Sequence, residues 1–133
     1  MNQTNKPADK ILVVDDDPDI SMMLKLMLEY KGYSVTIGEK PEETIKVLEK
    51  NNFSMVIIDM LLSGISGTDI CAEIRQNKKV AGAPVLMISA HPNARQICLQ
   101  AGADEFIAKP FDMKDIVSMI STLLIKKGRQ HPE

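Results

Sequence analysis

The stretch Ile11-Leu-Val-Val-Asp-Asp-Asp-Pro-Asp-Ile20 runs from four apolar residues directly into four carboxylates that are interrupted by one proline. The apolar half has the length and the β-branched character of a strand that is covered on both faces. Neighbouring carboxylates repel one another and raise each other's pKa unless positive charge compensates them. The stretch therefore predicts a buried strand with a cation-binding turn at its carboxyl end.

Composition limits the classes of protein to consider. With 133 residues, 44% of them hydrophobic, the chain can bury the core of one domain without disulfides or a structural metal. Its net charge of -2 gives no basic surface for nucleic acid or an anionic membrane. The N-terminus lacks the apolar core of a signal peptide, and no apolar run is long enough to span a bilayer. We therefore expect a cytoplasmic protein without direct nucleic-acid binding or membrane insertion.

Short apolar runs alternate with amphipathic segments along the chain. The short runs predict strands at 11–14, 34–37, 55–58, 84–89 and 105–108. The amphipathic segments predict helices at 18–31, 41–49, 67–76, 94–100 and 112–126. Five repeats of strand and helix indicate an α/β fold in three layers, with a doubly wound parallel sheet of five strands and five flanking helices. We expect the domain at 10–126, a disordered N-terminal tail at 1–9 and a C-terminal tail at 127–133.

Polar residues follow the predicted strands at the point where each strand ends. They are Asp15 and Asp16 after the first strand, Asp59 after the third, Ser89 after the fourth and Lys109 after the fifth. Ligands of such sheets gather beyond the carboxyl ends of the strands, so we expect these side chains to converge on one site. Carboxylates together with carbonyl oxygens suit a hard divalent cation such as Mg²⁺, which leaves a face for phosphate oxygens.

The same residues suggest phosphoryl transfer. A carboxylate at position 59 is ionised at neutral pH and can attack a phosphoryl group without a general base. The ammonium of Lys109 and the hydroxyl of Ser89 would then bind the charge on the phosphoryl oxygens.

Four motifs together resemble the receiver domain of bacterial two-component response regulators, a flavodoxin-like phosphoacceptor domain. They are Asp15-Asp16, Asp59, Ser89-Ala90 and Gly102-Ala-Asp-Glu-Phe-Ile-Ala-Lys-Pro-Phe111. The resemblance covers Lys10 to about Ile125 and implies the strand order 2-1-3-4-5. It implies that Asp59 accepts a phosphoryl group from a phosphohistidine of a sensor histidine kinase or a histidine phosphotransfer protein. The domain would then switch conformation to control a downstream protein, without turning over a separate substrate.

The resemblance also implies roles for individual residues. Asp16, Asp59 and the backbone carbonyl of Leu61 would ligate Mg²⁺ directly, and Asp15 would help through water. Lys109 would pair with the phosphoryl group, while Ser89 and the aromatic ring of Phe106 would move as the switch. The Lys109–Pro110 peptide bond is expected to be cis. A receiver of this kind would be a monomer or a phosphorylation-dependent dimer.

Two features depart from the family pattern. Receivers commonly have proline at the fourth position after the acceptor, where this chain has Ser63. The segment from Ser89 to Gly102 is about two residues shorter than usual, which abbreviates the fourth loop and helix. That region normally carries the phosphorylation-dependent surface, so the chemistry is more firmly predicted than the way in which the signal is displayed.

Several residues outside the acidic site have alternative interpretations. The predicted inner stripe of the first helix consists of Ile20, Met23, Leu24 and Met27. Met22 and Leu26 point away from this stripe and could dock a helical phosphotransfer partner or be scattered surface residues. Cys71 and Cys98 are predicted to be buried and reduced, because neither has a second cysteine at metal or redox spacing. Two other functions remain open: an adaptor that works without phosphorylation, and an aspartyl-nucleophile phosphatase, although the chain has no insertion that could cap a substrate.

Overall fold

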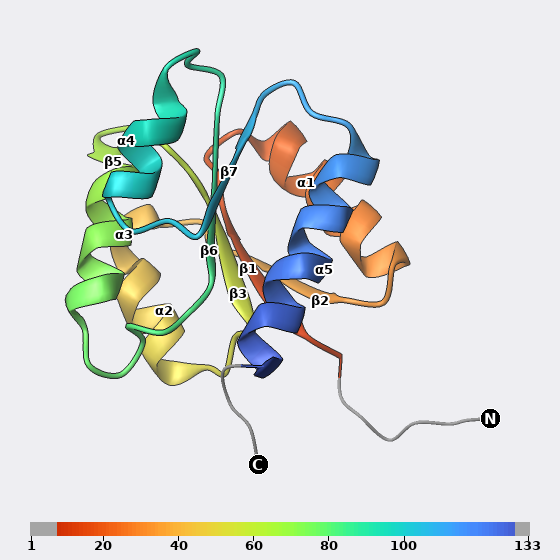
Figure 1. Ribbon diagram of the computed structural model, residues 1–133, viewed down its shortest axis with the longest axis horizontal. Helices are drawn as coiled ribbons and strands as arrows, with labels where there is room; N and C mark the ends of the chain where they lie inside the picture. The colour runs from red at the N-terminus through yellow and green to blue at the C-terminus, as the bar shows by residue number, and fades with distance from the viewer. Residues whose placement is uncertain (1–7, 130–133) are drawn as a thin grey trace.

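The five apolar runs form one parallel sheet at the centre of the molecule (Figure 1). The computed structural model describes residues 8–129. The strands of the sheet are β1 (Lys10–Val14), β2 (Ser34–Ile37), β3 (Met55–Asp59), β6 (Val85–Ser89) and β7 (Glu105–Ala108). Their order across the sheet is β2-β1-β3-β6-β7, and all neighbours are parallel. Counted along the chain as predicted strands, this is the expected order 2-1-3-4-5, so the predicted fold class is confirmed.

Helices cover both faces of the sheet. They are α1 (Pro18–Tyr30), α2 (Thr44–Lys50), α3 (Gly67–Gln76), α4 (Ala94–Gln100) and α5 (Met113–Arg129), with a short 3-10 helix, η1 (Pro41–Glu43), before α2. Figure 1 shows α1 and α5 on one side of the sheet and α2, α3 and α4 on the other. This is the three-layer arrangement that right-handed crossovers between parallel strands produce.

The alternation of side chains along each central strand divides the core into two clusters. In β1, Ile11 and Val13 belong to the cluster beneath α1 and α5, whereas Leu12 and Val14 belong to the cluster beneath α2, α3 and α4. All four side chains are completely buried, which explains why the run shows no alternation of polar and apolar residues.

The acidic turn begins α1 with the signals that the sequence contains. Asp17 is the N-cap, and its side chain accepts a hydrogen bond from the backbone N–H of Asp19 at 2.9 Å. Pro18 occupies the first turn, where its missing N–H costs nothing. Gly32 follows the helix with a φ of 102°, a conformation that glycine adopts without strain.

Two features differ from the predicted elements. A two-stranded antiparallel hairpin, β4 (Leu61–Leu62) and β5 (Ile65–Ser66), follows β3, and its short strands gave no periodic signal. Helix α5 continues to Arg129, so residues 127–129, which we assigned to a tail, are helical. The rest of that predicted tail, 130–133, and residues 1–7 of the predicted N-terminal tail lie outside the described residues.

The inner face of α1 is narrower than the periodicity predicts. Met23 and Met27, which we expected to face the core, are each 36% exposed. The buried residues of α1 are Ser21, Leu24 and Leu28. Because the helix meets the sheet along this single row, the methionines lie at its flanks.

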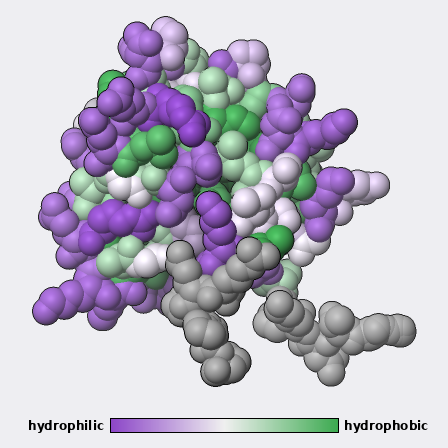
Figure 2. All heavy atoms as spheres, in the orientation of Figure 1, coloured by the Kyte–Doolittle hydropathy of each residue, from purple (hydrophilic) through white to green (hydrophobic). Residues whose placement is uncertain are grey.

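The surface is mixed in character. Hydrophilic residues cover most of the face shown in Figure 2, and hydrophobic residues are scattered among them. Among the described residues, no helix has the length and apolar character needed to cross a membrane.

Candidate functional site

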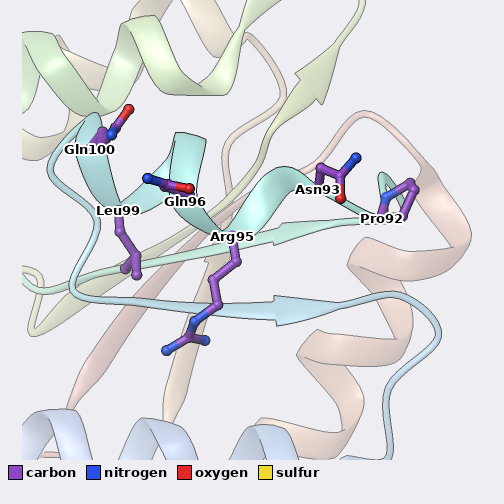
Figure 3. Close-up of a pocket in the computed structure, with 6 residues that line it drawn as sticks. All are labelled: Pro92, Asn93, Arg95, Gln96, Leu99 and Gln100. Atoms are coloured by element: carbon purple, nitrogen blue, oxygen red, sulfur yellow. The ribbon is translucent and has the colours of Figure 1, made fainter.

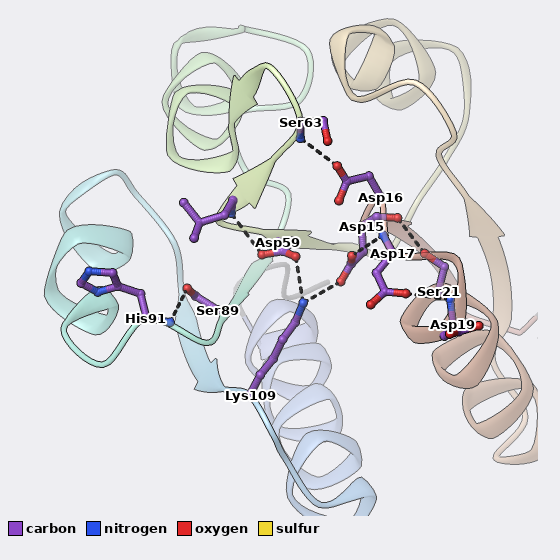
Figure 4. Close-up of polar contacts among 11 residues, drawn as sticks. Asp15, Asp16, Asp17, Asp19, Ser21, Asp59, Ser63, Ser89, His91 and Lys109 are labelled. Atoms are coloured by element: carbon purple, nitrogen blue, oxygen red, sulfur yellow. Dashed lines mark hydrogen bonds and ion pairs between the residues drawn. The ribbon is translucent and has the colours of Figure 1, made fainter.

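The carboxyl ends of β1, β3, β6 and β7 bring the predicted polar residues to one edge of the sheet (Figure 4). Asp59 and Ser89 are the last residues of β3 and β6, and Asp15 and Lys109 directly follow β1 and β7. The parallel register pairs Asp59 with Ile88 and Ser89 with Ala108, so the ends of these strands are level. The predicted convergence of these side chains is therefore present in the structure.

Lys109 joins two carboxylates of this edge. Its Nζ lies 2.8 Å from Oδ2 of Asp59 and 3.2 Å from Oδ2 of Asp15. The backbone N–H of Lys109 donates to the carbonyl of Ser89 at 2.8 Å, which fixes the start of the lysine side chain beside β6. The Lys109–Pro110 peptide bond is cis. Although burial lowers the pKa of Lys109, its hydrogen bonds and charge interactions with Asp59 and Asp15 outweigh this effect and raise the pKa.

Asp59 is held in place at both carboxylate oxygens. Oδ1 accepts a hydrogen bond from the backbone N–H of Leu61 at 3.1 Å, and Oδ2 pairs with Lys109. The side chain is only 9% exposed, so little of this carboxylate faces water. The start of α3 approaches so closely that a Cβ at Gly67 would overlap the carbonyl oxygen of Asp59.

Asp15 is the buried acidic residue of the site. Its side chain has no exposed surface, and Oδ1 accepts from the backbone N–H of Asp17 at 2.9 Å. The hydroxyl of Ser21 donates to the backbone carbonyl of Asp15 at 2.8 Å, which anchors the turn to the first turn of α1. Burial raises the pKa of Asp15, and the negative charge of Asp59 adds to the increase.

Asp16 is the exposed acidic residue of the site. Its Oδ2 accepts from the backbone N–H of Ser63 at 2.7 Å, in the turn between β4 and β5. Hydrogen bonding by the side chain and the main chain of Ser63 lowers the pKa of Asp16. The sequence marked Ser63 only as a departure from the family pattern, and no spacing rule predicts this contact across 47 positions.

The three carboxylates fit a hard divalent cation by their chemistry. One oxygen from each of Asp15, Asp16 and Asp59 lies within 4.8 Å of the others. Three negative charges face the single ammonium of Lys109, so the cluster carries excess negative charge that a divalent cation would neutralise. Oxygen ligands in this number suit Mg²⁺, which retains water in its remaining positions.

The two predicted switch residues lie beside this cluster. Ser89 is completely buried, and its Oγ accepts from the backbone N–H of His91 at 3.0 Å. Phe106 is 8% exposed and belongs to the hydrophobic cluster that includes Ala94 and Cys98 of α4. Both predicted switch residues are thus on the side of the sheet that faces α4.

The predicted docking residues lie on the outer surface of α1, the helix that the acidic turn begins. Met22 is 49% exposed and Leu26 is 62% exposed. Tyr30, one helical turn further, is 85% exposed. Together with the half-exposed Met23 and Met27, they give α1 more exposed large hydrophobic side chains than any other described element.

A shallow depression of about 740 Å³ lies on α4 and the loop before it (Figure 3). Its lining residues are Pro92, Asn93, Arg95, Gln96, Leu99 and Gln100. The side chain of Arg95 extends from α4 across β7 and ends 3.9 Å from a carboxylate oxygen of Glu105. None of the acidic residues of the site lines this depression, so it is separate from the carboxyl edge.

Comparison with known proteins agrees with this geometry. Residues 11–121 match the model of the response regulator receiver domain. The chain belongs to the response regulator receiver family. Its cysteines fit such a domain as core residues, since Cys71 and Cys98 are both buried and burial raises the pKa of Cys71 to about 11.

Relatives of this receiver include regulators with known sequences and structures. It is 32% identical to the transcriptional regulatory protein ResD of Bacillus subtilis over 93% of its length and 50% of that protein. It is 34% identical to TrrA of Thermotoga maritima, solved in complex with Mg²⁺–BeF, with a TM-score of 0.78 over 86% of this chain and 98% of that one. A receiver domain protein from Clostridium thermocellum is 27% identical, with a TM-score of 0.84 over 92% and 99%. The chain spans about half the length of the curated relatives it matches.

Proposed function

We propose that this receiver accepts a phosphoryl group on Asp59 from a phosphohistidine of a sensor histidine kinase or a histidine phosphotransfer protein. The observation that carries the proposal is the pairing of Asp59 with Lys109 at 2.8 Å beside two further carboxylates. The carboxylate of Asp59 faces the ammonium of Lys109, and the acidic cluster beside it suits a divalent cation. Together, these two positive charges would stabilise the negative charge of a phosphoryl group during its transfer. The complex of TrrA with Mg²⁺–BeF supports the same metal for this chain.

In the proposed reaction, a carboxylate oxygen of Asp59 attacks the phosphorus atom and forms an acyl phosphate. The bond between phosphorus and the donor's imidazole nitrogen breaks, and that nitrogen keeps the electron pair. Lys109 already lies against Asp59 and can follow the charge onto the phosphoryl oxygens. Asp16 and Asp59 would hold Mg²⁺ directly and Asp15 through water, and the ion would supply further positive charge to the phosphoryl group. The carbonyl of Leu61 would complete this ligand set.

The proposed output is a change of shape rather than a released product. Ser89 would exchange its bond from the N–H of His91 for a bond to the phosphoryl group. Because Ser89 begins the connection to α4, its movement would shift that connection and open space for Phe106 to change rotamer. The receiver would assist its own phosphorylation and dephosphorylation, without turnover of a separate substrate.

We propose that the phosphodonor docks on α1 beside the acidic turn. Met22 and Leu26 supply exposed apolar surface one helical turn apart, as a helical partner requires. A separate groove of about 580 Å³ lies between α1 and α5, and its lining combines Met27, Met113 and Val117 with lysine, serine and threonine side chains. The net charge of -2 favours protein partners over nucleic acid for these residues. The proposed setting is the cytoplasm, where the receiver acts as a monomer or a phosphorylation-dependent dimer.

The experiment is phosphorylation by acetyl phosphate and by a phosphorylated histidine kinase, with Mg²⁺, followed by intact mass. We expect the wild type to gain the mass of one phosphoryl group and Asp59→Asn to gain none. Asp69→Asn is the matched control, because Asp69 is an exposed carboxylate on α3 outside the acidic cluster. Equal labelling of Asp59→Asn would refute the acceptor assignment. Partner binding that is unchanged by the phosphodonor and by Asp59→Asn would instead indicate the phosphorylation-independent adaptor.

A further inference from the structure

Ser63 makes one contact that the proposed mechanism does not use. Its backbone N–H donates to Oδ2 of Asp16 at 2.7 Å, and this bond links the acidic turn after β1 to the hairpin after β3 (Figure 4). The other two carboxylates of the site are held differently. Asp15 and Asp59 are both paired with Lys109 and each accepts a backbone N–H from two residues onward. Among the described residues, Ser63 is the only other residue that hydrogen-bonds to the Asp16 side chain.

We propose that Ser63 is a positioning residue that holds Asp16 in the orientation from which it ligates a divalent cation. The proposal rests on the proposed function of the acidic site and deepens it. Asp16 is exposed, so without the bond its side chain would rotate freely in water. Groups that orient a metal ligand through a second hydrogen bond contribute to metal affinity because they remove this freedom.

The geometry of the acidic cluster supports a Ser63 bond that orients Asp16, rather than one that competes with the ion for Asp16. With Ser63 bonded to Asp16, one oxygen from each of the three carboxylates still lies within 4.8 Å of the others. Ligand oxygens on one Mg²⁺ lie at most about 4.2 Å apart, since each is about 2.1 Å from the ion. The spacing of the three carboxylates therefore allows them to surround one ion, with Asp15 acting through a bound water. A carboxylate has two oxygens, so Asp16 can keep the Ser63 bond on Oδ2 and offer the other oxygen.

The hairpin turn makes the proposal testable with a proline. Gly64 has a φ of 77°, and Ser63 before it is not among the residues with positive φ. This combination is the pattern of a type II turn, whose first central position favours proline. Ser63→Pro therefore suits the turn while it removes both the N–H and the hydroxyl. Ser63→Ala removes the hydroxyl alone and keeps the N–H.

The test is the dissociation constant for Mg²⁺ alone, measured by isothermal titration calorimetry on the full chain. We expect Ser63→Pro to weaken binding about tenfold and Ser63→Ala less than about threefold. In an Asp16→Ala background, Ser63→Pro should cause no further loss, because Ser63 acts through Asp16. A merely structural role for Ser63 would weaken binding equally in both backgrounds.

The outcomes separate this proposal from the proposed function. Affinity of Ser63→Pro within twofold of the wild type would overturn the positioning role, and tighter binding would show that the bond competes with the ion. An additive loss in the Asp16→Ala background would also overturn it. Absence of Mg²⁺ binding by the wild type would contradict the metal site itself, and thus the proposed function rather than the role of Ser63 alone.

Discussion

The two ends of β6 carry ionic clusters that differ in their balance of positive and negative charge. At the amino end, Arg75 of α3 pairs with Asp104 at 2.8 Å and donates to the carbonyls of Gly102, Ala81 and Ala83. The same oxygen of Asp104 accepts from the backbone N–H of Val85 at 2.8 Å. At the carboxyl end, the ammonium of Lys109 pairs with Asp15 and Asp59, and the carboxylate of Asp16 lies beside them without a cationic partner among the described residues.

The difference in charge balance distinguishes a cluster that stabilises the fold from a cluster that can bind a ligand. The cluster of Arg75 has one cation for one anion, and its donors meet acceptors, so it needs nothing further and serves to fasten α3 to the sheet. The acidic site has an excess of negative charge and a buried carboxylate, Asp15, whose pKa is raised. A chain retains such a cluster at a cost in stability when another cation and a charged group bind there.

The largest effect is expected from Gly67→Ala, which tests whether the acidic end depends on close backbone packing. The new Cβ would overlap the carbonyl oxygen of Asp59 and push α3 away from β3. We expect a loss of about 3 kcal/mol in the free energy of unfolding, together with slower phosphorylation, since Asp59 would move. Urea denaturation and the rate of labelling by acetyl phosphate measure the two effects. Gly82→Ala is the control, because a Cβ there has open space; an equal loss in both variants would contradict the packing argument.

The next effect is expected from Arg75→Ala, which breaks the balanced cluster. The variant leaves Asp104 without its cation and three carbonyls without a donor, so we expect a loss of about 2 kcal/mol in unfolding free energy. Labelling of the folded variant by acetyl phosphate should stay within twofold of the wild type. Arg95→Ala removes an exposed arginine 3.9 Å from Glu105 and should cost less than about 0.5 kcal/mol. If Arg75→Ala lost labelling by acetyl phosphate but kept its stability, the structural role assigned to the Arg75 cluster would be wrong.

The smallest effect, of opposite sign, is expected from Asp15→Asn. Because the pKa of Asp15 is raised on folding, the folded state binds its proton more tightly than the unfolded state does. The contribution of Asp15 to stability is therefore most favourable at low pH and declines as pH rises from the unfolded pKa through the folded one. At neutral pH without Mg²⁺, Asp15→Asn should raise the unfolding free energy by about 1 kcal/mol.

A matched control for this prediction is Asp16→Asn. The pKa of Asp16 is lowered, so its contribution has the opposite dependence: it is present at neutral pH and is lost as pH falls through the folded pKa. Asp16→Asn should therefore leave stability at neutral pH unchanged or slightly lower. Denaturation curves across the acid range measure both variants, and a stability loss in Asp15→Asn would contradict the account of the buried charge.

Much of this arrangement was predictable from the sequence. Each central strand is a short apolar run, and a polar residue follows directly, so the register of parallel strands alone brings Asp15, Asp59 and Lys109 together. Asp17 caps the start of α1 and Gly32 follows its end, and each of these signals depends on only one or two residues that are adjacent in the sequence. The resemblance to receivers supplied the strand order and the cis Lys109–Pro110 bond.

The remaining features depend on contacts between distant segments. The β4–β5 hairpin has strands of two residues, too short for any periodic pattern, and its bond from Ser63 to Asp16 joins loops that the fold alone makes neighbours. The Arg75 cluster likewise draws on three segments of chain, so its acceptors could not be assigned from spacing. The exposure of Met23 and Met27 depends on how narrowly α1 meets the sheet, which helical periodicity does not determine.

The most direct test of the difference between the two ends is a titration with Mg²⁺ followed by backbone amide chemical shifts. Saturable shifts should appear at Asp15, Asp16, Asp59, Leu61 and Lys109, and the amides of Arg75, Val85 and Asp104 should not move. Comparable shifts at both ends of β6, or no saturable shift at the acidic end, would contradict the account.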